Sequence, residues 1–410
     1  MGEGSTIRPV ARFRTAFLGC KVSYVDAREV GEQLRADGHE EVPAGAPADI
    51  AVISTCCVTG EALAKSRKAA VRAARAHARV FLTGCGANLA GRPFAGLPAN
   101  VRVVDRPAEE TAAAVAAEVG ALGCVQAAAG PARVRAFVKI QDGCSFACAF
   151  CVVPLVRGAS RSRPAAAVLA EVARRVEQGH REVVLTGINL GCFRDREAGY
   201  DLARLVRDAG ATPGLARLRL SSIEVNHLSG DLVAALRETP TAARHLHVPL
   251  QSGDDGVLRA MRRRYTSAGF LRKLEPLAGE FNLTTDAIVG FPGEDERAFR
   301  RTLATVERAG ISRVHVFPYS PRPGTATAAD DPVPPAVKRE RSARLRALSG
   351  ELERRRWRRK LGTRDVVLVD RPGRGYGDDY SPFLVDAPVG ELVEVTATSV
   401  CEEGILAVAA

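Results

Sequence analysis

Three cysteines lie close together in the stretch "DGCSFACAFC", where Cys144, Cys148 and Cys151 have the spacing C-x3-C-x2-C. Thiolates are ligands for zinc and for iron–sulfur clusters. A structural zinc site needs four ligands, and the nearest downstream histidine, His180, lies too far along the sequence to complete this loop. An iron–sulfur cluster held by only three thiolates keeps one iron open for a substrate or cofactor. The spacing therefore predicts a catalytic iron–sulfur site.

A second set of three cysteines follows apolar runs in the first third of the chain: Cys20 after "RFRTAFLG", Cys56 after "DIAVIST" and Cys85 after "ARVFLTG". Helical stretches separate these runs, which predicts a parallel sheet. Ligands bind at the carboxyl edge of open parallel sheets, so these cysteines predict a second open thiolate site. The competing interpretation is that each is a small buried apolar residue. Cys57 adjoins Cys56 and leaves two candidates at the second strand.

The elements that must position these cysteines fall into three predicted domains. Residues 1–128 hold the first α/β series and end near a linker, "CVQAAAGPAR". Residues 129–348 hold six further apolar runs separated by helical stretches, which predicts a partial (βα)6 barrel with its site at the strand carboxyl ends. Residues 349–410 hold short β-like runs and Gly-rich turns such as "RPGRGYGDD", which predict a small β-barrel. The predicted fold class is α/β: an amino-terminal parallel α/β domain, a central partial barrel and a carboxy-terminal β-barrel.

Composition narrows the class of protein. The chain of 410 residues is 46% hydrophobic and 26% charged, which is typical of a soluble globular protein. No apolar run is long enough to span a bilayer and the start lacks the apolar core of a signal peptide, so we expect a cytoplasmic protein with no membrane partner. The ten cysteines are then expected to be ligands, redox groups or buried residues rather than disulfides. Nothing in the sequence demands a partner chain, and we expect a monomer.

Positive charge is concentrated near the carboxy terminus of a chain whose net charge is +11. Residues 338–360 hold eleven Lys or Arg and three acidic residues. A solvated helix face is the ordinary interpretation of a charge run. This run is nearly single-signed and is interleaved with Trp357, which favours contact with phosphates. We therefore expect a nucleic-acid partner.

Together these motifs resemble the radical S-adenosylmethionine methylthiotransferases. "CSFACAFC" is similar to the cluster loop of radical S-adenosylmethionine enzymes, and "FLGCK", "STCCVTGEA" and "TGCGAN" are similar to the family's amino-terminal domain. "LTGINLG", "HLHVPLQSGDDGVLRAMRRRYT", "DAIVGFPGE" and "HVFPYSPRPGTATA" resemble its central domain, and the last sixty residues resemble a TRAM domain, an RNA-binding β-barrel. The chain departs from the family at Ser54, where Asn is usual, and at Val225, where Pro is common. Neither departure removes a presumed ligand.

The resemblance implies two [4Fe-4S] clusters and S-adenosylmethionine as cofactors. The family replaces the C2 hydrogen of an adenine with a methylthio group, and that C–H bond is not acidic enough for a side-chain base, so a cofactor-borne radical is required. The cluster that binds S-adenosylmethionine would lie on Cys144, Cys148 and Cys151. The resemblance selects Cys56 over Cys57, so the second cluster, which would carry the sulfur to be inserted, is implied on Cys20, Cys56 and Cys85.

Further residues at the predicted strand ends are candidates for S-adenosylmethionine contacts. The competing interpretation is that each is a turn residue or a helix cap. His245, His247 and His315 lie on apolar strands and are expected to line the core or the barrel interior. The candidates are Gly187 and Asn189 for the amino acid end, Ser222 and Glu224 for the ribose, Gln251 in the same place one strand on, and Gly290 and Phe291 for the adenine.

Within the family, "LGCK", "RRRYT" and "HVFPYSPRPGT" resemble most closely the branch that acts on N6-threonylcarbamoyladenosine at tRNA position 37. The implied partners are tRNA, through its anticodon loop, and an electron donor such as a flavodoxin or ferredoxin. The alternatives are the branch acting on N6-isopentenyladenosine and the branch acting on an aspartate of a ribosomal protein. A rival from another class is a non-catalytic RNA-binding protein with structural metal sites, which predicts four-ligand zinc and no turnover of S-adenosylmethionine.

Overall fold

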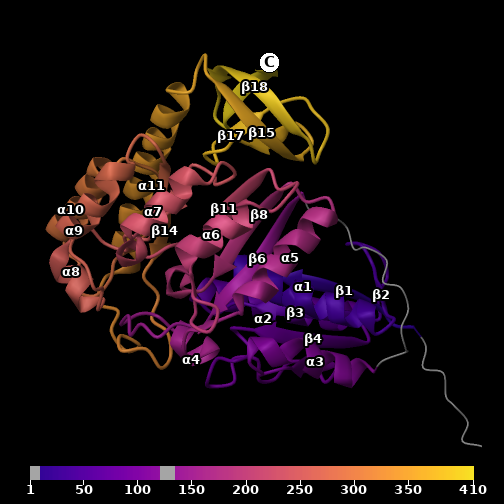
Figure 1. The fold of residues 1–410 in the computed structure, drawn as a ribbon. Helices are drawn as coiled ribbons and strands as arrows, with labels where there is room; N and C mark the ends of the chain where they lie inside the picture. Colours follow the sequence, from indigo (N-terminus) through magenta and orange to yellow (C-terminus); the bar gives the residue numbers. More distant parts are fainter. Residues whose placement is uncertain (1–9, 121–133) are drawn as a thin grey trace, which may run out of the picture.

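The computed structural model describes residues 10–120 and 134–410. Its amino-terminal domain is a five-stranded parallel sheet in the order β2-β1-β3-β4-β5 (Figure 1). Alternation along the central strand explains why the sheet has helices on both faces, since Ile50 and Val52 pack in the core under α1 and α3, while Ala51 and Ile53 pack in the core under α2. The elements are β1 (Arg12–Phe17), α1 (Lys21–Ala36), β2 (Glu40–Glu41), β3 (Ile50–Thr55), α2 (Gly60–Ala76), β4 (Arg79–Gly84), β5 (Val101–Val103) and α3 (Ala108–Val119).

The central domain is a partial barrel of six parallel strands. Two sheets, β11-β8-β6-β7 and β12-β13-β14, are joined by isolated bridges from Leu218 to Ala242 and from Ser222 to His247. The strands are β6 (Arg135–Asp142), β7 (Arg161–Ser162), β8 (Glu182–Gly187), β9 (Arg194–Asp195), β10 (Tyr200–Asp201), β11 (Arg217–Leu220), β12 (His245–His247), β13 (Asn282–Val289) and β14 (Ile311–Pro318). The helices are α4 (Val153–Arg157), α5 (Ala165–Glu177), η1 (Leu190–Cys192), α6 (Leu202–Gly210), η2 (Val225–His227), α7 (Gly230–Glu238), α8 (Asp255–Ala260), α9 (Ser267–Leu274), η3 (Glu275–Leu277) and α10 (Glu296–Arg308).

The two faces of the first barrel strand, β6, pack against different parts of the molecule. Ala136, Val138 and Ile140 face the large core that the barrel strands share with the surrounding helices. The alternate residue Phe137 faces α1 of the amino-terminal domain, where its ring lies 5.4 Å from that of Tyr24 and its carbonyl oxygen accepts a hydrogen bond from Arg28 Nη1 at 2.7 Å. The amino-terminal domain therefore packs directly on the edge of the barrel, and this contact brings the two predicted cysteine sites together.

A long helix, α11 (Pro335–Arg358), leads to a closed β-barrel in the order β15-β16-β17-β19-β18 (Figure 1). The predicted α/β class with a small carboxy-terminal β-barrel is confirmed. The predicted start of this domain at residue 349 falls inside α11, and we place the start at Arg364 instead, where the first barrel strand begins. One strand also forms within the stretch predicted as a Gly-rich turn. The strands are β15 (Arg364–Arg371), β16 (Arg374–Tyr376), β17 (Pro382–Leu384), β18 (Leu392–Val400) and β19 (Ile405–Ala409).

The basic run of residues 338–360 is less free than its composition suggests. Trp357 is 6% exposed and packs in the barrel core, so it is not available to stack on a base. Lys338 and Arg341 are buried and pair with Asp331 and Glu294. Further cations of the run pair with acidic residues, so only part of the charge predicted for RNA faces solvent. The additional pairs are Arg344 with Glu296 and Glu340, Arg355 with Glu307 and Glu351, Arg356 with Asp379, and Lys360 with Asp365 and Asp379.

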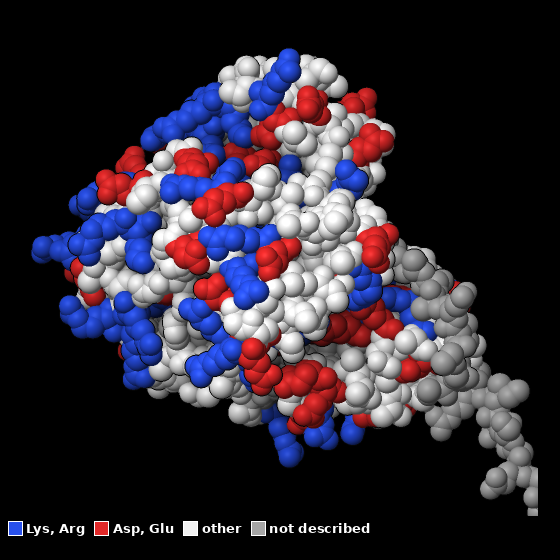
Figure 2. Space-filling model, in the orientation of Figure 1, with Lys and Arg blue, Asp and Glu red and all other residues white. Residues whose placement is uncertain are grey.

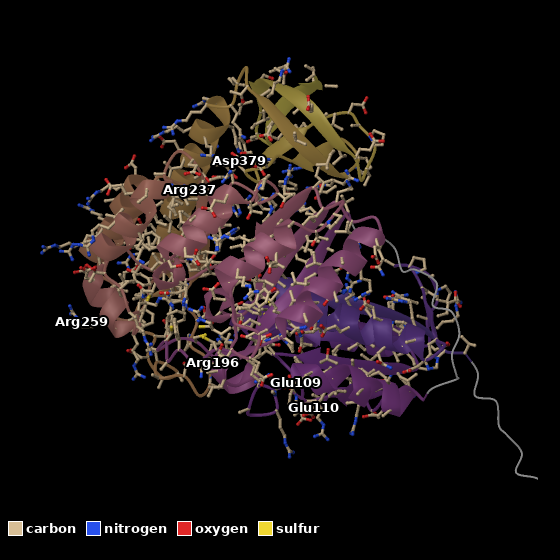
Figure 3. All side chains as sticks on the ribbon, in the orientation of Figure 1. Glu109, Glu110, Arg196, Arg237, Arg259 and Asp379 are labelled. Atoms are coloured by element: carbon tan, nitrogen blue, oxygen red, sulfur yellow. The ribbon has the colours of Figure 1, made fainter. Side chains whose placement is uncertain are left out.

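Asp379 shows how the carboxy-terminal barrel is anchored to the rest of the chain. It lies where this barrel meets α11 (Figure 3), and it accepts hydrogen bonds from Arg356 at 2.7 Å. Arg217 of β11 donates to the carbonyl oxygen of Tyr376 at 3.1 Å and pairs with the buried Glu182.

Lysine and arginine side chains are nevertheless exposed on the surface over α11 and over the helices α8 to α10 (Figure 2). The exposed charge is therefore spread over α11 and the three helices α8 to α10.

None of the helices in residues 10–120 and 134–410 combines the length and apolar character needed to cross a membrane. The predicted linker near residues 124–133, with Cys124 and the expected boundary at residue 128, lies outside the described residues.

Candidate active site

The first cysteine site is a loop between β6 and α4. Gly143 opens it with φ +67°, and a Cβ there would lie 2.0 Å from the carbonyl oxygen of Ala159, so only glycine fits. The Cys144 N–H donates to the carbonyl oxygen of Gly158 at 3.0 Å, and the Cys151 N–H donates to that of Cys148 at 3.1 Å. These bonds hold the start and the end of the loop, and the three thiols stay partly exposed.

Two polar side chains from later parts of the barrel domain reach these thiols: Asn189 follows β8, and Arg263 lies between α8 and α9. Arg263 Nη1 donates to Cys148 Sγ at 3.4 Å, and Asn189 Nδ2 donates to Cys144 Sγ at 3.7 Å. Burial raises the pKa of the Cys151 thiol to about 12, and the neighbouring cysteines add to the rise. N–H donors stabilise sulfur in its anionic form, so the loop is equipped to hold thiolates once a metal has displaced their protons.

The second site lies where three parallel strands end. Cys20 follows β1 and is exposed, whereas Cys56 follows β3 and Cys85 follows β4, and both are buried. Burial raises the pKa of Cys56, with the Cys20 thiol contributing in the same direction. Burial also raises the pKa of Cys85 to about 11, although Arg157 acts against it and the Cys20 thiol again contributes to the rise. The three thiols therefore share one electrostatic environment, as the sheet topology predicts.

Cys57 lies beside this group, and its contacts differ from those of Cys56. Its side chain is fully buried, it packs with Leu89 and Val152, and its Sγ donates to the carbonyl oxygen of Cys85 at 3.3 Å. A Cβ built on Gly19 would lie 3.2 Å from Cys56 Cβ, so Cys56 rather than its neighbour adjoins the Cys20 turn. The geometry thus supports the choice of Cys56.

A buried ionic network connects the two sites. Arg157, at the end of α4, donates from Nε to Cys85 Sγ at 2.9 Å and pairs with Asp26 at 2.6 Å and with Asp142 at 3.1 Å. Lys139 pairs with the same Asp26 at 2.7 Å. Although burial acts to raise it, the pKa of Asp26 is lowered because Arg157 and Lys139 stabilise the carboxylate. The network fixes the end of one cysteine loop against the other cysteine site.

The residues present fit iron–sulfur clusters better than single metal ions. In the described part of the chain, no three His, Cys, Asp or Glu side chains lie close enough to hold one ion. A mononuclear zinc draws its four ligands onto one atom, whereas the thiolates of a cluster bind separate irons and stay further apart. Each site offers three thiols, and in each site at least one sulfur accepts an N–H group, from Arg263 at Cys148 and from Arg157 at Cys85.

Of the other predicted residues, those nearest the first cysteine loop are Asn189 and Glu224. Asn189 is buried, and its N–H donates to Gln141 Oε1 at 2.7 Å. Gly187 packs against the same Gln141 and leaves no room for a side chain. Glu224 is buried and accepts from Arg263 at 3.4 Å and from the Asn226 N–H at 2.9 Å, so its carboxylate is already partnered. Ser222 is exposed.

Of the remaining predicted residues, Phe291 packs against the cysteine loop, and Gly290 and Gln251 have positive φ angles. Phe291 is 1% exposed, and its ring packs 6.2 Å from that of Phe150 inside the cysteine loop. Gly290 has φ +73°, and its N–H donates to Glu294 Oε1 at 2.8 Å. Gln251 has φ +65°, a strained conformation for a residue with a side chain, and its backbone joins β13 through hydrogen bonds to Asp286 and Ile288. Strain of this kind is common at ligand sites.

Sequence reasoning missed the arginines. Arg157 contacts the sulfur of a cysteine 72 residues away in sequence, and Arg263 contacts the sulfur of one 115 residues away. At such separations, no motif or spacing in the sequence indicates which arginine meets which cysteine. Cys192, in η1 just past the end of β8, has its Sγ 3.5 Å from His227 Nε2. His245 and His247 line the barrel interior as predicted and share a hydrogen bond to Thr284 Oγ1, at 3.0 and 2.9 Å.

Comparisons with known proteins agree with this organisation. Residues 138–306 match the radical SAM superfamily, and residues 12–105 match a family described as uncharacterized protein family UPF0004. The chain is 34% identical over 417 residues to the threonylcarbamoyladenosine tRNA methylthiotransferase MtaB of Thermotoga maritima, covering 96% of each chain. It is 33% identical to the tRNA-2-methylthio-N(6)-dimethylallyladenosine synthase of Jannaschia sp., covering 88% of this chain and 83% of the relative. Among solved structures, the radical S-adenosylmethionine methyltransferase TsrM from Kitasatospora setae has the same fold, with a TM-score of 0.54, 13% identity, and coverage of 78% and 74%.

Proposed function

Because the chain belongs to the radical SAM methylthiotransferase family and is a tRNA methylthiotransferase, we propose that its substrate is N6-threonylcarbamoyladenosine at position 37 of tRNA. The product would be the 2-methylthio derivative. The observation that carries this assignment is the similarity to the Thermotoga maritima relative over 96% of both chains, because it includes the segments that lie between the shared motifs. The Jannaschia relative keeps N6-isopentenyladenosine as the second candidate substrate.

We assign the two cysteine trios to two [4Fe-4S] clusters. Membership of the radical SAM family implies S-adenosylmethionine and one cluster, and for that cluster we assign Cys144, Cys148 and Cys151. We further assign a second cluster to Cys20, Cys56 and Cys85. When bound, these groups supply the one-electron and sulfur-transfer chemistry that no side chain of the protein can provide at an adenine C–H bond.

The protein's own residues would hold the clusters and S-adenosylmethionine in place and exclude water from the cysteine sulfurs. Arg263 and Asn189 direct N–H groups at the sulfurs of the first trio, and Arg157 does the same at Cys85. Burial of Cys56 and Cys85 keeps water away from their sulfurs. The backbone at Gln251 and the strand end at Gly187 are our candidates for contact with S-adenosylmethionine. Ser222, which is exposed one strand away, is our candidate for the ribose.

The substrate and the reductant must reach the cysteine sites from outside the contact between the amino-terminal domain and the barrel. We propose that the anticodon loop of tRNA contacts the exposed basic surface over α8 to α11, and that the carboxy-terminal barrel contributes as an RNA-binding module (Figure 2). The reductant would be a small electron carrier such as a flavodoxin or ferredoxin. We propose that the enzyme acts as a monomer, since both cysteine trios belong to one chain.

The test is mass spectrometry of tRNA nucleosides from cells with and without this gene. We expect 2-methylthio-N6-threonylcarbamoyladenosine to disappear on deletion while its unthiolated precursor accumulates. The wild-type gene should restore it, and a gene encoding Cys144→Ala should not. Loss of the 2-methylthio-isopentenyl nucleoside instead would move the substrate to the second candidate. No change in either nucleoside would overturn the proposed substrate and direct attention to ribosomal protein.

A further inference from the structure

Lys21 is a cation without a carboxylate partner beside the second cysteine site. It is the first residue of α1 and follows Cys20 directly. Its side chain is half-buried, and among residues 10–120 and 134–410 no acceptor lies within hydrogen-bond or ion-pair distance of its ammonium group. Other buried cations in this region, such as Lys139 and Arg157, are each paired with two or more carboxylates. A partly desolvated cation without an anion costs free energy, so this position favours an anionic ligand.

The face of α1 that carries Lys21 looks into the barrel. Residues three, four and seven positions apart share a helix face, so Lys21 lies on the face of Tyr24 and Arg28. Both of those residues contact Phe137, whose side chain lies on the side of β6 opposite the large core. α1 also packs against β8, the next strand of the barrel. Lys21 therefore projects from the amino-terminal domain into the space that the barrel strands enclose.

The charges that act on Lys21 agree with this placement. The ionisable groups near enough to act on the Lys21 ammonium come from the barrel and from the carboxy-terminal domain. Arg219 is fully buried on β11, and its guanidinium lies 4.6 Å from the ring centroid of Tyr380. The groups are Tyr380, Arg219, Arg135 and Glu182.

The opposite wall of the same space supplies imidazoles and an open aromatic face. Register places Asp286 of β13 opposite His315 of β14, and the ring centroids of His247 and His315 lie 5.4 Å apart. Asp286 pairs with His247 Nε2 at 3.1 Å, so its carboxylate is partnered without Lys21. His315 is exposed, and Phe317, two residues on along the same face of β14, is 37% exposed. Lys21, His247 and His315 together are called the Lys21 subsite below.

We propose that the Lys21 subsite binds the carboxylate of the N6-threonylcarbamoyl group, with the Lys21 ammonium as its counter-ion. This inference rests on the proposed function, and it names the group that would distinguish that substrate from the isopentenyl one. In adenine, the ring nitrogen N1 is bonded on one side to C2 and on the other to C6, the carbon that carries N6. A base whose C2 is presented to the second cysteine site therefore carries its N6 substituent close by. The Lys21 Cα is only ~3.8 Å from the Cys20 Cα, as in any trans peptide.

The subsite would select by charge. A threonylcarbamoyl group ends in a carboxylate and a hydroxyl, which can pair with the ammonium and with an imidazole N–H. An isopentenyl group is apolar and would leave Lys21 desolvated and unpaired. Sites built to bind a polar group reject analogues that lack it, because their own polar groups are then left without partners.

The experiment compares two RNA substrates on each preparation of the reconstituted holoenzyme. One is an anticodon stem-loop carrying N6-threonylcarbamoyladenosine at position 37, and the other is the same RNA with that carboxylate converted to its methyl ester. The readouts are kcat/KM for the methylthio product, RNA affinity from fluorescence anisotropy, and iron content. The variants are Lys21→Met, Lys21→Arg, and Lys65→Met as the matched control, because Lys65 is an exposed lysine of the same domain.

We expect the wild type to prefer the acid over the ester by on the order of 10- to 100-fold, the scale of one charge-assisted hydrogen-bonded pair. Lys21→Met should bring the ratio close to one, Lys21→Arg should retain part of it, and Lys65→Met should keep the wild-type ratio. Partial loss of a cluster next to Cys20 would not disturb this result, since both substrates are measured on the same protein.

Two results would overturn the inference. A wild-type ratio near one would show that the carboxylate is not recognised. An equal fall with both substrates in Lys21→Met would show that Lys21 contacts a phosphate or only supports the fold. A wild-type enzyme that acts on the isopentenyl RNA and on neither of these two RNAs would overturn the proposed function itself, which separates the two failures.

Discussion

The two cysteine sites have the same composition and opposite construction. Cys144, Cys148 and Cys151 come from one loop of eight residues, remain partly exposed, and receive their N–H donors from the barrel that carries them. Cys20, Cys56 and Cys85 come from three separate strands, two of them are buried, and the donor to Cys85 comes from another domain.

This difference means that the geometry of the first site is set by nearby residues of one loop, whereas the geometry of the second site is set by the packing of a whole domain. The loop site depends on backbone hydrogen bonds within residues 143–159 and on the packing of Phe150 against Phe291. The strand site depends on the register of a whole sheet and on Arg157, which belongs to the loop site's own α4. Damage to the loop should therefore reach the strand site through Arg157, whereas damage to the strand site should leave the loop intact.

The largest effect should follow from Cys144→Ala. We expect S-adenosylmethionine cleavage and methylthio product to fall together by ~1000-fold or more, the scale for removing an essential catalytic group. The measurements are product formation with reconstituted enzyme and the electron paramagnetic resonance spectrum of the reduced protein. The signal of the second cluster should persist, because Cys144→Ala leaves Arg157 and its contact with Cys85 in place. Normal cleavage of S-adenosylmethionine by this variant would contradict the assignment of the loop.

Cys85→Ala should separate formation of the methylthio product from cleavage of S-adenosylmethionine. We expect methylthio product to disappear while cleavage of S-adenosylmethionine continues, because the loop site does not depend on β4. Iron content should fall by about half, since one of two clusters is lost. Cys57→Ala is the control: it removes a buried thiol from the same strand edge, costs ~1 kcal/mol of stability, and keeps both iron and product. Loss of product in Cys57→Ala, with normal product in Cys56→Ala, would move the ligand at the end of β3 from Cys56 to Cys57.

A smaller and more specific effect is expected at Arg157. Arg157→Lys keeps a cation for Asp26 and Asp142 and loses the N–H donated to Cys85 Sγ. We expect product formation to fall by about 10- to 100-fold, as for other residues that support a metal ligand. The reduction potential of the second cluster should become more negative, because one donor that stabilises the added electron is gone. Potentiometry followed by electron paramagnetic resonance measures this shift.

Arg157→Gln and Arg161→Gln test the structural role of Arg157, the second as a control at an exposed arginine. Arg157→Gln leaves two buried carboxylates short of a partner and should lower the free energy of unfolding by about 3–5 kcal/mol in denaturant titrations. Arg161 is exposed and pairs with the exposed Glu109, so Arg161→Gln should change stability by less than about 1 kcal/mol. An unchanged potential in Arg157→Lys would mean that the contact with Cys85 is structural only.

Some features could be predicted from the sequence because they are local or periodic. The three-thiol loop is visible as a spacing, and the strand-end cysteines are visible because apolar runs, helices and cysteines repeat in one order. The basic run was predicted less well. Charge along a helix says nothing about which cations meet acidic residues of other elements, so the buried pairs of Lys338 and Arg341 could not be foreseen. Trp357 entered the barrel core for the same reason.

The sequence alone determined the kind of chemistry, because two sets of three thiols and the spacing of one of them fix a donor set without reference to neighbours. It also determined the order of the domains, since strand and helix periods are local properties of the chain. Only the tertiary structure decided which residues tune and connect the sites. Arg157 meets Cys85, Arg263 meets Cys148, and Lys21 faces the barrel interior because α1 packs on β6. Such pairs depend on how domains dock, and docking depends on surfaces that residues far apart in sequence build together.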